Sequence, residues 1–256
     1  MAVGSSTSVN RGIPDDIDLR RVPSHVACVM DGNGRWAQAR GLARSKGHQA
    51  GEQALIDVVE AALDIQVKWL TIYVLSTENW RRPTSELQFL LNNVKRVLLH
   101  WRDKLHDRGV RIQFIGRRDR RVPAHLGELM DEVVALTEDN RNMTLTAAFN
   151  YGGRAEIVDA VRKIVASGMP VEQVTEKAIA SHLYDPDMPD PDLIIRTAGE
   201  YRTSNFLLWR SAYSEFYFTE TPWPDFRRRH FFEAVSVYQK RVRRFGGIPR
   251  SPEVRA

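Results

Sequence analysis

Apolar residues along this chain form two alternating kinds of segment. Short runs rich in β-branched residues predict strands that are covered on both faces, because such strands have no polar side. Between these runs, apolar residues recur every three or four positions, which is the spacing of a helix with one buried face. The alternation predicts a single α/β domain in which a parallel six-stranded sheet is flanked by helices.

Strands are expected over 26–30, 69–75, 110–115, 143–150 and 192–195, with a sixth at either 206–209 or 215–218. Helices are expected over about 47–65, from Ser85, after Pro123, from Asn150, weakly over 175–183, and over 225–245. The carboxyl ends of parallel strands share one edge of the sheet, where α/β proteins bind ligands. We therefore expect the site among residues that follow the strands.

Composition supports one folded domain. The chain has 256 residues, of which 43% are hydrophobic and 27% charged. We expect a mobile N-terminal arm over 1–22, the functional domain over 23–245 and a tail over 246–256. No run approaches the ~20 apolar residues of a spanning helix, and no signal-peptide core is present, so a cytoplasmic protein is expected.

The net charge is +5, and arginine accounts for most of it. Arginine binds phosphate and carboxylate groups through a planar fork, so a phosphorylated small molecule, a nucleic acid or a membrane surface would each suit this charge. The arginine-rich last helix leaves open a peripheral contact with the inner face of the cell membrane. Cys28, the only cysteine, excludes a disulfide within the chain.

Polar residues follow the first, second and fifth expected strands. The segment 31–35 combines an acid, two glycines and an arginine, which suits a metal-bound phosphate approached closely by the backbone. The residues expected at this edge are Asp31, Arg35, Arg44, His48, Glu78, Asn79, Arg82, Arg196, Glu200, Arg202, Ser204 and Glu215. Their arginines fall into two sets, one near Arg35 and one near Arg196, which predicts two anionic substrates. Magnesium takes one or two carboxylates, and Asp31 with Glu215 is the expected pair.

Three long motifs resemble those of the cis-prenyltransferases, also called Z-type isoprenyl diphosphate or undecaprenyl diphosphate synthases. The motifs are 25–37, 76–83 and 192–209 together with Glu215, and the likeness runs over about 25–244. The resemblance implies a homodimer with a parallel sheet ringed by helices. It also implies a Mg²⁺-dependent enzyme that condenses isopentenyl diphosphate with an allylic primer, geranyl or farnesyl diphosphate, to form a Z double bond.

The resemblance also assigns roles to single residues. Asp31 is expected to be catalytic and to bind magnesium, Glu215 to be a second metal ligand, and Asn79 to take part in proton removal. Primer binding is expected of Gly32, Asn33, Gly34, Arg35, Trp36, Arg44 and His48. Isopentenyl diphosphate binding is expected of Arg196, Arg202, Thr203 and Ser204. Closure over the substrates is expected of Ser76, Thr77, Glu78, Trp80 and Arg82.

Two places depart from the family pattern. Tyr201 stands where many relatives carry histidine, which puts a metal or phosphate contact there in doubt. Val74 and Leu75 stand where many long-chain relatives have Ala-Phe, on the expected wall of the product tunnel. Bulk on such a wall is a steric stop. We therefore hypothesise a short product, (2Z,6E)-farnesyl diphosphate made from geranyl diphosphate, with a decaprenyl or undecaprenyl product as the alternative.

Alternatives of other classes fit the residues less well. Gly32-x-Gly34-x-x-Ala37 imitates a dinucleotide-binding fingerprint, but an oxidoreductase of that kind needs an acid after the second strand, where Ser76 and Thr77 stand. A nucleic-acid binder would interleave its arginines with stacking aromatic residues, so no nucleic acid is expected as a partner. A non-catalytic partner subunit would lack the acid and the arginines, which this chain retains.

Overall fold

The chain, described by a computed structural model over residues 12–242, forms one sheet of six strands. The strands are β1 (His25–Val29), β2 (Trp69–Ser76), β3 (Val110–Ile115), β4 (Met143–Tyr151), β5 (Leu193–Arg196) and β6 (Glu215–Phe218). Their order across the sheet is β3-β4-β2-β1-β5-β6, and every neighbouring pair is parallel. The predicted fold class is therefore confirmed.

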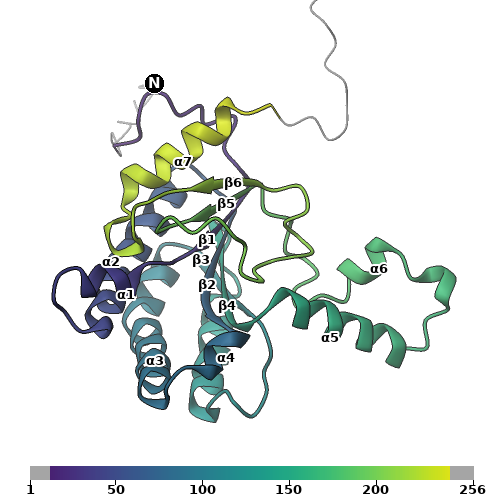
Figure 1. The fold of residues 1–256 in the computed structure, drawn as a ribbon. Coiled ribbons are helices and arrows are strands. Elements are labelled where there is room, and N and C mark those ends of the chain that lie inside the picture. The colour runs from purple at the N-terminus through teal and green to yellow at the C-terminus, as the bar shows by residue number, and fades with distance from the viewer. Residues whose placement is uncertain (1–11, 243–256) are drawn as a thin grey trace, which may run out of the picture.

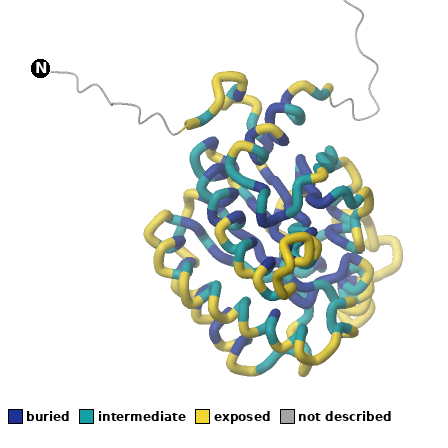
Figure 2. The backbone as a smooth tube through the Cα atoms, turned by 60° about the vertical axis from the view of Figure 1, so that its left-hand side comes forward, coloured by how far each residue is buried: buried dark blue, intermediate teal, exposed yellow. Residues whose placement is uncertain are grey.

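Helices connect the strands on both sides of the sheet. They are α1 (Asn33–Gln38), α2 (Arg44–Asp64), α3 (Thr84–Asp107), α4 (Ala124–Thr137), α5 (Gly153–Ala166), α6 (Glu176–Ala180) and α7 (Arg228–Lys240), with the short 3₁₀ helices η1 (Thr77–Arg81), η2 (Val171–Gln173) and η3 (Trp223–Asp225). In Figure 1, α2, α3 and α7 lie on one side of the strands, whereas α5 and α6 project on the other. Figure 2 shows the strands buried at the centre and the outer turns of the helices exposed.

The sixth strand is 215–218 and not 206–209, the other segment considered. Residues Ser204, Asn205 and Leu207 have positive φ angles of 49°, 65° and 47°, which break an extended strand. Phe206 and Leu207 are buried by packing instead, and Phe206 stacks on Tyr73 with ring centroids 4.5 Å apart. A run of apolar residues thus became a turn because the backbone around it is left-handed.

The strand order brings three polar segments to one place. β1 pairs with β2 on one side and with β5 on the other. The segments that follow these three strands are 31–35, 76–82 and 196–205, and each leaves the same edge of the sheet. Since ligands bind at this kind of position in parallel sheets, the fold assembles the expected site.

The described part of the expected N-terminal arm, residues 12–22, packs against α7. Ile17 is buried, Ser236 Oγ donates a hydrogen bond to Asp16, and Gln239 bonds to the backbone of Asp18. Buried apolar area and these bonds hold residues 12–22 against α7. Residues 1–11 and the expected tail, 246–256, lie outside the described residues.

The arginines at the start of the last helix form ion pairs within the chain, so they are less available for a membrane contact than the sequence indicated. Arg227 forms an ion pair with Asp57 at 3.2 Å, and Arg228 forms one with Asp64 at 2.5 Å, so both contact α2. Arg241, after α7, pairs with Glu215. These three guanidinium groups join α7 to its neighbours. Arg243 and Arg244 lie outside the described residues.

Candidate active site

Asp31 and Arg196 form the centre of the site. Arg196, the last residue of β5, places Nη2 3.0 Å from Asp31 Oδ2, and its side chain is only 4% exposed. Its Nη1 donates to Ser204 Oγ at 2.7 Å and to the carbonyl oxygen of Arg202. One buried guanidinium therefore joins the segment after β1 to the loop after β5.

The backbone of Asp31 is held from two sides. Asp31 N donates to Thr197 Oγ1 at 2.9 Å, and the same hydroxyl donates to Asp31 O at 2.8 Å. Trp223 N also donates to Asp31 O, at 2.9 Å, and Gly32 N donates to the Asp31 carboxylate at 2.7 Å. These bonds fix the direction of the carboxylate before any ligand arrives. Thr197 is a site residue that the sequence reasoning missed, although it lies inside a motif.

Close contacts surround glycines 32 and 34. Gly32 has φ 98°, and a Cβ there would lie 2.6 Å from the Cβ of Ala198. A Cβ on Gly34 would lie 2.7 Å from the guanidinium carbon of Arg44, so Arg44 lies directly over this glycine. The loop continues into α1, a helix of six residues that the pattern did not predict because only Ala37 in it is buried.

The two expected sets of arginines are interleaved in the structure. Arg35 Nη2 lies 2.9 Å from Glu200 and 3.8 Å from Asp31, and Arg202 also bonds to Glu200. Glu200 thus bridges one arginine from the segment after β1 and one from the loop after β5. Arg35 and Arg202 are more than half exposed, so both can turn to a ligand. The two sets of arginines therefore lie next to each other, which suits two anions bound side by side.

His48 lies near further arginines at the mouth of the site. Arg82 Nη1 pairs with Glu86 at 2.7 Å, and Arg44 approaches the same carboxylate at 3.7 Å. Burial, together with the charges of Arg82 and Arg44 and opposed by that of Glu86, lowers the pKa of His48 to about 4. The imidazole is therefore neutral at pH 7, and it can donate a hydrogen bond to a diphosphate without carrying charge.

The turn after β2 is held by its own hydrogen bonds. Ser76 N donates to Asn79 Oδ1 at 2.9 Å, which forms a capping box at the start of η1. Trp80 Nε1 donates to Asn150 at 2.6 Å, and Asn205 donates to Glu78 at 2.9 Å. The last bond connects this turn to the loop after β5. The three motifs therefore converge on one site.

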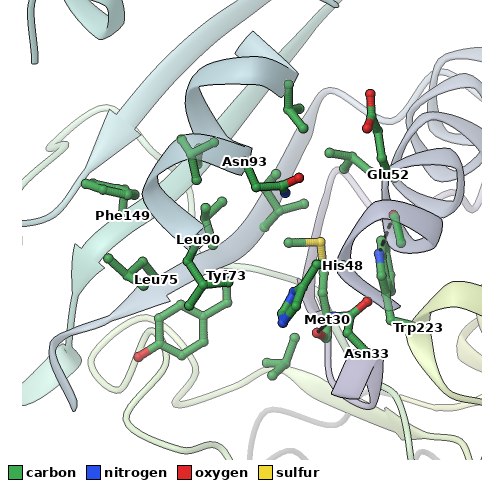
Figure 3. A pocket seen from close by; sticks show the side chains of 18 of the residues that line it. Met30, Asn33, His48, Glu52, Tyr73, Leu75, Leu90, Asn93, Phe149 and Trp223 are labelled. Carbon is green, nitrogen blue, oxygen red and sulfur yellow. Dashed lines mark hydrogen bonds between the residues drawn. The ribbon is translucent and has the colours of Figure 1, made fainter. Parts of the chain in front are cut away.

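A cavity of about 800 Å³ begins at this site and continues between α2, α3 and the sheet. The predicted residues that line it are Asp31, Asn33, His48, Ser76, Glu78, Asn79, Arg82, Arg196, Arg202 and Ser204. Figure 3 shows His48, Asn33 and Met30 together on one side of the cavity, with Leu75, Leu90 and Phe149 on the apolar wall opposite. A polar mouth above an apolar tunnel suits a molecule with a charged head and a hydrocarbon tail.

Trp36 does not point into this cavity. Its Nε1 donates to Asp225 at 2.8 Å, and Arg40 lies over its ring at 4.2 Å. The side chain holds α1 against η3. Tyr201 is exposed and donates to Glu220 at 3.0 Å.

Glu215 is far from Asp31 within one chain, contrary to the expectation that the two acids form a pair. Glu215 begins β6 opposite Leu193, whereas Arg196, which contacts Asp31, lies opposite Phe218. Three residues of strand separate the two levels, or roughly 10 Å. The Glu215 carboxylate pairs with Arg241 at 2.8 Å instead. The sequence could not exclude the pair, because it left open whether 206–209 or 215–218 is the sixth strand, and therefore whether Glu215 lies at the start of a strand.

The carboxylate of Asp31 fits a magnesium ion that arrives with a diphosphate. Among residues 12–242, no group of three or more His, Cys, Asp or Glu side chains could hold a metal by itself. Asp31 is partly accessible and surrounded by arginines. Magnesium is commonly bound by one or two carboxylates together with phosphate oxygens and water.

Among residues 12–242, no helix is long and apolar enough to cross a membrane.

Known proteins resemble this chain over most of its length. The family model described as putative undecaprenyl diphosphate synthase matches residues 29–246. A (2Z,6E)-farnesyl diphosphate specific trans,polycis-polyprenyl diphosphate synthase from Thermobifida fusca is 49% identical over 243 residues, 93% of this chain and 86% of that protein. Decaprenyl diphosphate synthase from Mycobacterium bovis is 46% identical over 230 residues, 88% of this chain and 77% of that protein. Lavandulyl diphosphate synthase from Lavandula x intermedia, solved with dimethylallyl diphosphate, has a TM-score of 0.85 at 34% identity, covering 89% of this chain and 99% of that one.

Proposed function

Because the chain belongs to the undecaprenyl diphosphate synthase family and is a cis-prenyltransferase, we propose that it extends geranyl diphosphate with one isopentenyl unit to give (2Z,6E)-farnesyl diphosphate. The observation that carries the proposal is the Asp31–Arg196 pair at the mouth of an apolar tunnel. It joins a metal-binding acid, anion-binding arginines and a hydrocarbon channel in one place.

The residues of the site divide the work between two diphosphates. Arg35, Arg44 and the neutral His48 are proposed to hold the diphosphate of the primer, whose tail enters the tunnel. Arg202 and Ser204 are proposed to hold isopentenyl diphosphate beside it. Charge-assisted hydrogen bonds of this kind contribute about 1.5–3 kcal/mol each.

Asp31 is proposed to hold Mg²⁺, which when bound would supply positive charge to the leaving diphosphate. As the bond between the primer's carbon and its diphosphate breaks, positive charge develops on the allylic carbon. The double bond of isopentenyl diphosphate attacks that carbon, and loss of a proton leaves the new Z double bond. The residues act by orientation and by stabilising the departing charge.

Asn79 is proposed to help orient the groups that take part in proton removal. It does not act as the base itself, because a neutral amide does not accept a proton at pH 7. Its Oδ1 accepts the hydrogen bond from Ser76 N, while the side chain lines the cavity. Ser76, Thr77, Glu78, Trp80 and Arg82 would then set the position of this turn over the substrates.

The short product is supported by the wall of the tunnel. Val74 and Leu75 both line the cavity, and Leu75 is buried. Val74, Leu98 and Phe114 contact both the core beside α2 and the cluster around Leu75, so they lie where the two regions meet. Side chains at such a junction limit the space for a longer chain.

A long-chain product is the second candidate, and the depth of the cavity favours it. The cavity continues beyond this junction to Trp101, Leu105, Ile112 and Leu145. The relative from Mycobacterium bovis is a decaprenyl diphosphate synthase. Space below the junction could hold further isoprene units once the wall is passed.

We also propose a homodimer in the cytoplasm. Val158, Val161 and Val165 lie on one face of α5 at helical spacing and are 46%, 44% and 73% exposed. A second copy would cover this apolar face. For Glu215, a metal role would need an arrangement that this single chain does not contain, so Asp31 is proposed as the chain's own ligand.

The test is a product analysis. The purified chain is given labelled isopentenyl diphosphate in excess with geranyl or farnesyl diphosphate, with Mg²⁺ or with EDTA, and the dephosphorylated products are separated by chromatography. We expect a Mg²⁺-dependent C15 product from geranyl diphosphate. Decaprenyl-sized products would establish the long-chain alternative, and no product with any primer would overturn the proposed function.

A further inference from the structure

A group of polar side chains crosses the apolar tunnel wall between α2 and α3. Glu52, one turn after His48 on α2, lines the cavity, and its side chain is only 13% exposed. Its Oε1 accepts a hydrogen bond from Trp101 Nε1 at 2.7 Å, and its Oε2 pairs with Arg96 Nη2 at 2.5 Å. Arg96 Nη2 also donates to Asn93 Oδ1 at 2.9 Å. We call these four residues the polar collar.

Apart from Arg102, the residues that continue the wall on both helices beside the collar are apolar. On α2, Leu55, Ile56 and Val59 continue the same lining below Glu52, and on α3 Val94 and Val97 do so beside Asn93. Four residues of helix place Glu52 about 6 Å below His48. Figure 3 shows Glu52 and Asn93 reaching the cavity from the two helices. The collar therefore lies between the polar mouth and the deeper apolar space.

Acid–arginine pairs join α2 to α3, or to Arg108 directly after α3, at three levels, but the pairs differ in their position relative to the cavity. Arg44 approaches Glu86 at 3.7 Å, Glu52 pairs with Arg96, and Glu60 pairs with Arg108 at 2.5 Å. Of these carboxylates, the cavity is lined by that of Glu52 and not by those of Glu60 or Glu86. Joining the helices does not require an acid in the tunnel, since Glu60 does this outside it.

Glu52 is an anion at neutral pH. Burial opposes its charged form, but hydrogen bonds from Arg96 and Trp101 outweigh this effect and lower the pKa below the ordinary glutamate value. A hydrocarbon chain that grows past the carboxylate removes the water that remains around it, and an ionised group resists that change strongly.

We propose that the polar collar, through Glu52, limits how far the prenyl chain grows and so helps to determine product length. The inference rests on the proposed function and deepens it. The end of the growing chain enters the tunnel beneath His48 and meets the collar about one helical turn further in. Movement of the chain end beyond the collar adds no stabilisation. Release of a short product then becomes faster than another addition.

The test compares Glu52→Leu with Glu60→Leu. Both changes remove an acid of α2 that pairs with an arginine on α3 or directly after it, but of the two acids only Glu52 lines the cavity. Each variant and the parent receive geranyl diphosphate and excess labelled isopentenyl diphosphate, and products are compared at equal conversion. In Glu52→Leu we expect the fraction of products longer than the parent's main product to rise at least fivefold, whereas Glu60→Leu keeps the parental pattern.

Asn93→Leu provides a second variant that leaves the Glu52–Arg96 pair in place, and it should lengthen the products to a smaller extent. If Glu52→Leu does not fold, the product lengths of Asn93→Leu test the role of the collar. Products of parental length from a folded, active variant at Glu52, or from Asn93→Leu when that is the variant available, would overturn the role of the collar alone. An inactive parent would overturn the proposed function and the collar together.

Discussion

Arg196 Nη2 lies 3.0 Å from Asp31 Oδ2, although the two residues are 165 positions apart in the chain. The guanidinium is almost fully buried, whereas the carboxylate is about one third exposed. Arg196 therefore stabilises an acid that still faces the substrates. The pair connects the strand ends of β1 and β5 and fixes the point around which the other arginines gather.

Asp31→Asn should abolish most of the activity and weaken the fold slightly. Asparagine keeps the size of the side chain but loses the charge that a metal ion needs, so we expect incorporation of labelled isopentenyl diphosphate to fall on the order of a hundredfold or more. Loss of the bond to buried Arg196 should lower the free energy of unfolding by roughly 1–3 kcal/mol.

Urea denaturation monitored by tryptophan fluorescence provides the stability measurement for this variant. Asp57→Asn is the control, because Asp57 pairs with Arg227 at 3.2 Å away from the cavity and should leave activity unchanged. A folded Asp31→Asn protein that kept more than about a tenth of the parental rate would contradict the catalytic role.

Thr197→Val should slow the reaction more than it weakens binding. The hydroxyl of Thr197 accepts from Asp31 N and donates to Asp31 O, and valine removes both bonds while keeping the shape. We expect kcat to fall by about tenfold to a hundredfold, because a small displacement of a catalytic group has effects of this size. KM values should change little.

Thr197→Ser retains the hydroxyl and should restore most of kcat. Steady-state kinetics with both substrates measures the difference between the two variants. Equal kcat values for valine and serine would show that Thr197 serves packing and not the position of Asp31.

Gly34→Ala should raise the KM for the allylic diphosphate. The new Cβ would lie 2.7 Å from the guanidinium carbon of Arg44, so Arg44 must move away from the primer site. Loss of one charge-assisted hydrogen bond corresponds to about a tenfold increase or more. Gly127→Ala on α4 is the control, since its nearest atom would be Arg118 Nη1 at 3.8 Å. The same KM in both variants would rule out this role of Arg44.

Stability should fall as the pH is lowered from about 6.5 to about 4. Burial lowers the pKa of His25 to about 4, although hydrogen bonding to Pro189 and the charge of Asp192 oppose it. In this range the unfolded chain binds a proton at this histidine and the folded chain does not, so acid favours unfolding. The full effect is about 3 kcal/mol for a shift of this size.

Urea denaturation at several pH values between 7.5 and 4.5 measures this dependence. His48, whose pKa is also lowered to about 4, contributes in the same direction. His25→Gln removes one titrating group and should make stability less dependent on pH. An unchanged pH dependence in that variant would show that His25 does not contribute.

Local patterns in the sequence were sufficient for much of the architecture. The strand over 110–115 was predicted with the bounds of β3, and the other main elements differ mainly at their ends. Periodicity reports which side of an element is buried, and this is a property of neighbouring residues. The segments after β1, β2 and β5 also met as expected, because parallel strands end at a common edge.

Tertiary structure decided which side chains meet. The register of β6 placed Glu215 away from Asp31, and left-handed residues made a turn of 204–207. Arg227 and Arg228 pair with acids on α2, and Glu52 of α2 pairs with Arg96 of α3. Such pairs depend on helix rotation, strand register and packing between distant segments, none of which a local pattern of apolar and polar residues contains. The sequence by itself determined that the sheet is parallel, how strands and helices succeed one another along the chain, and the chemistry at the edge of the sheet. The folded chain determined the partners of each charge.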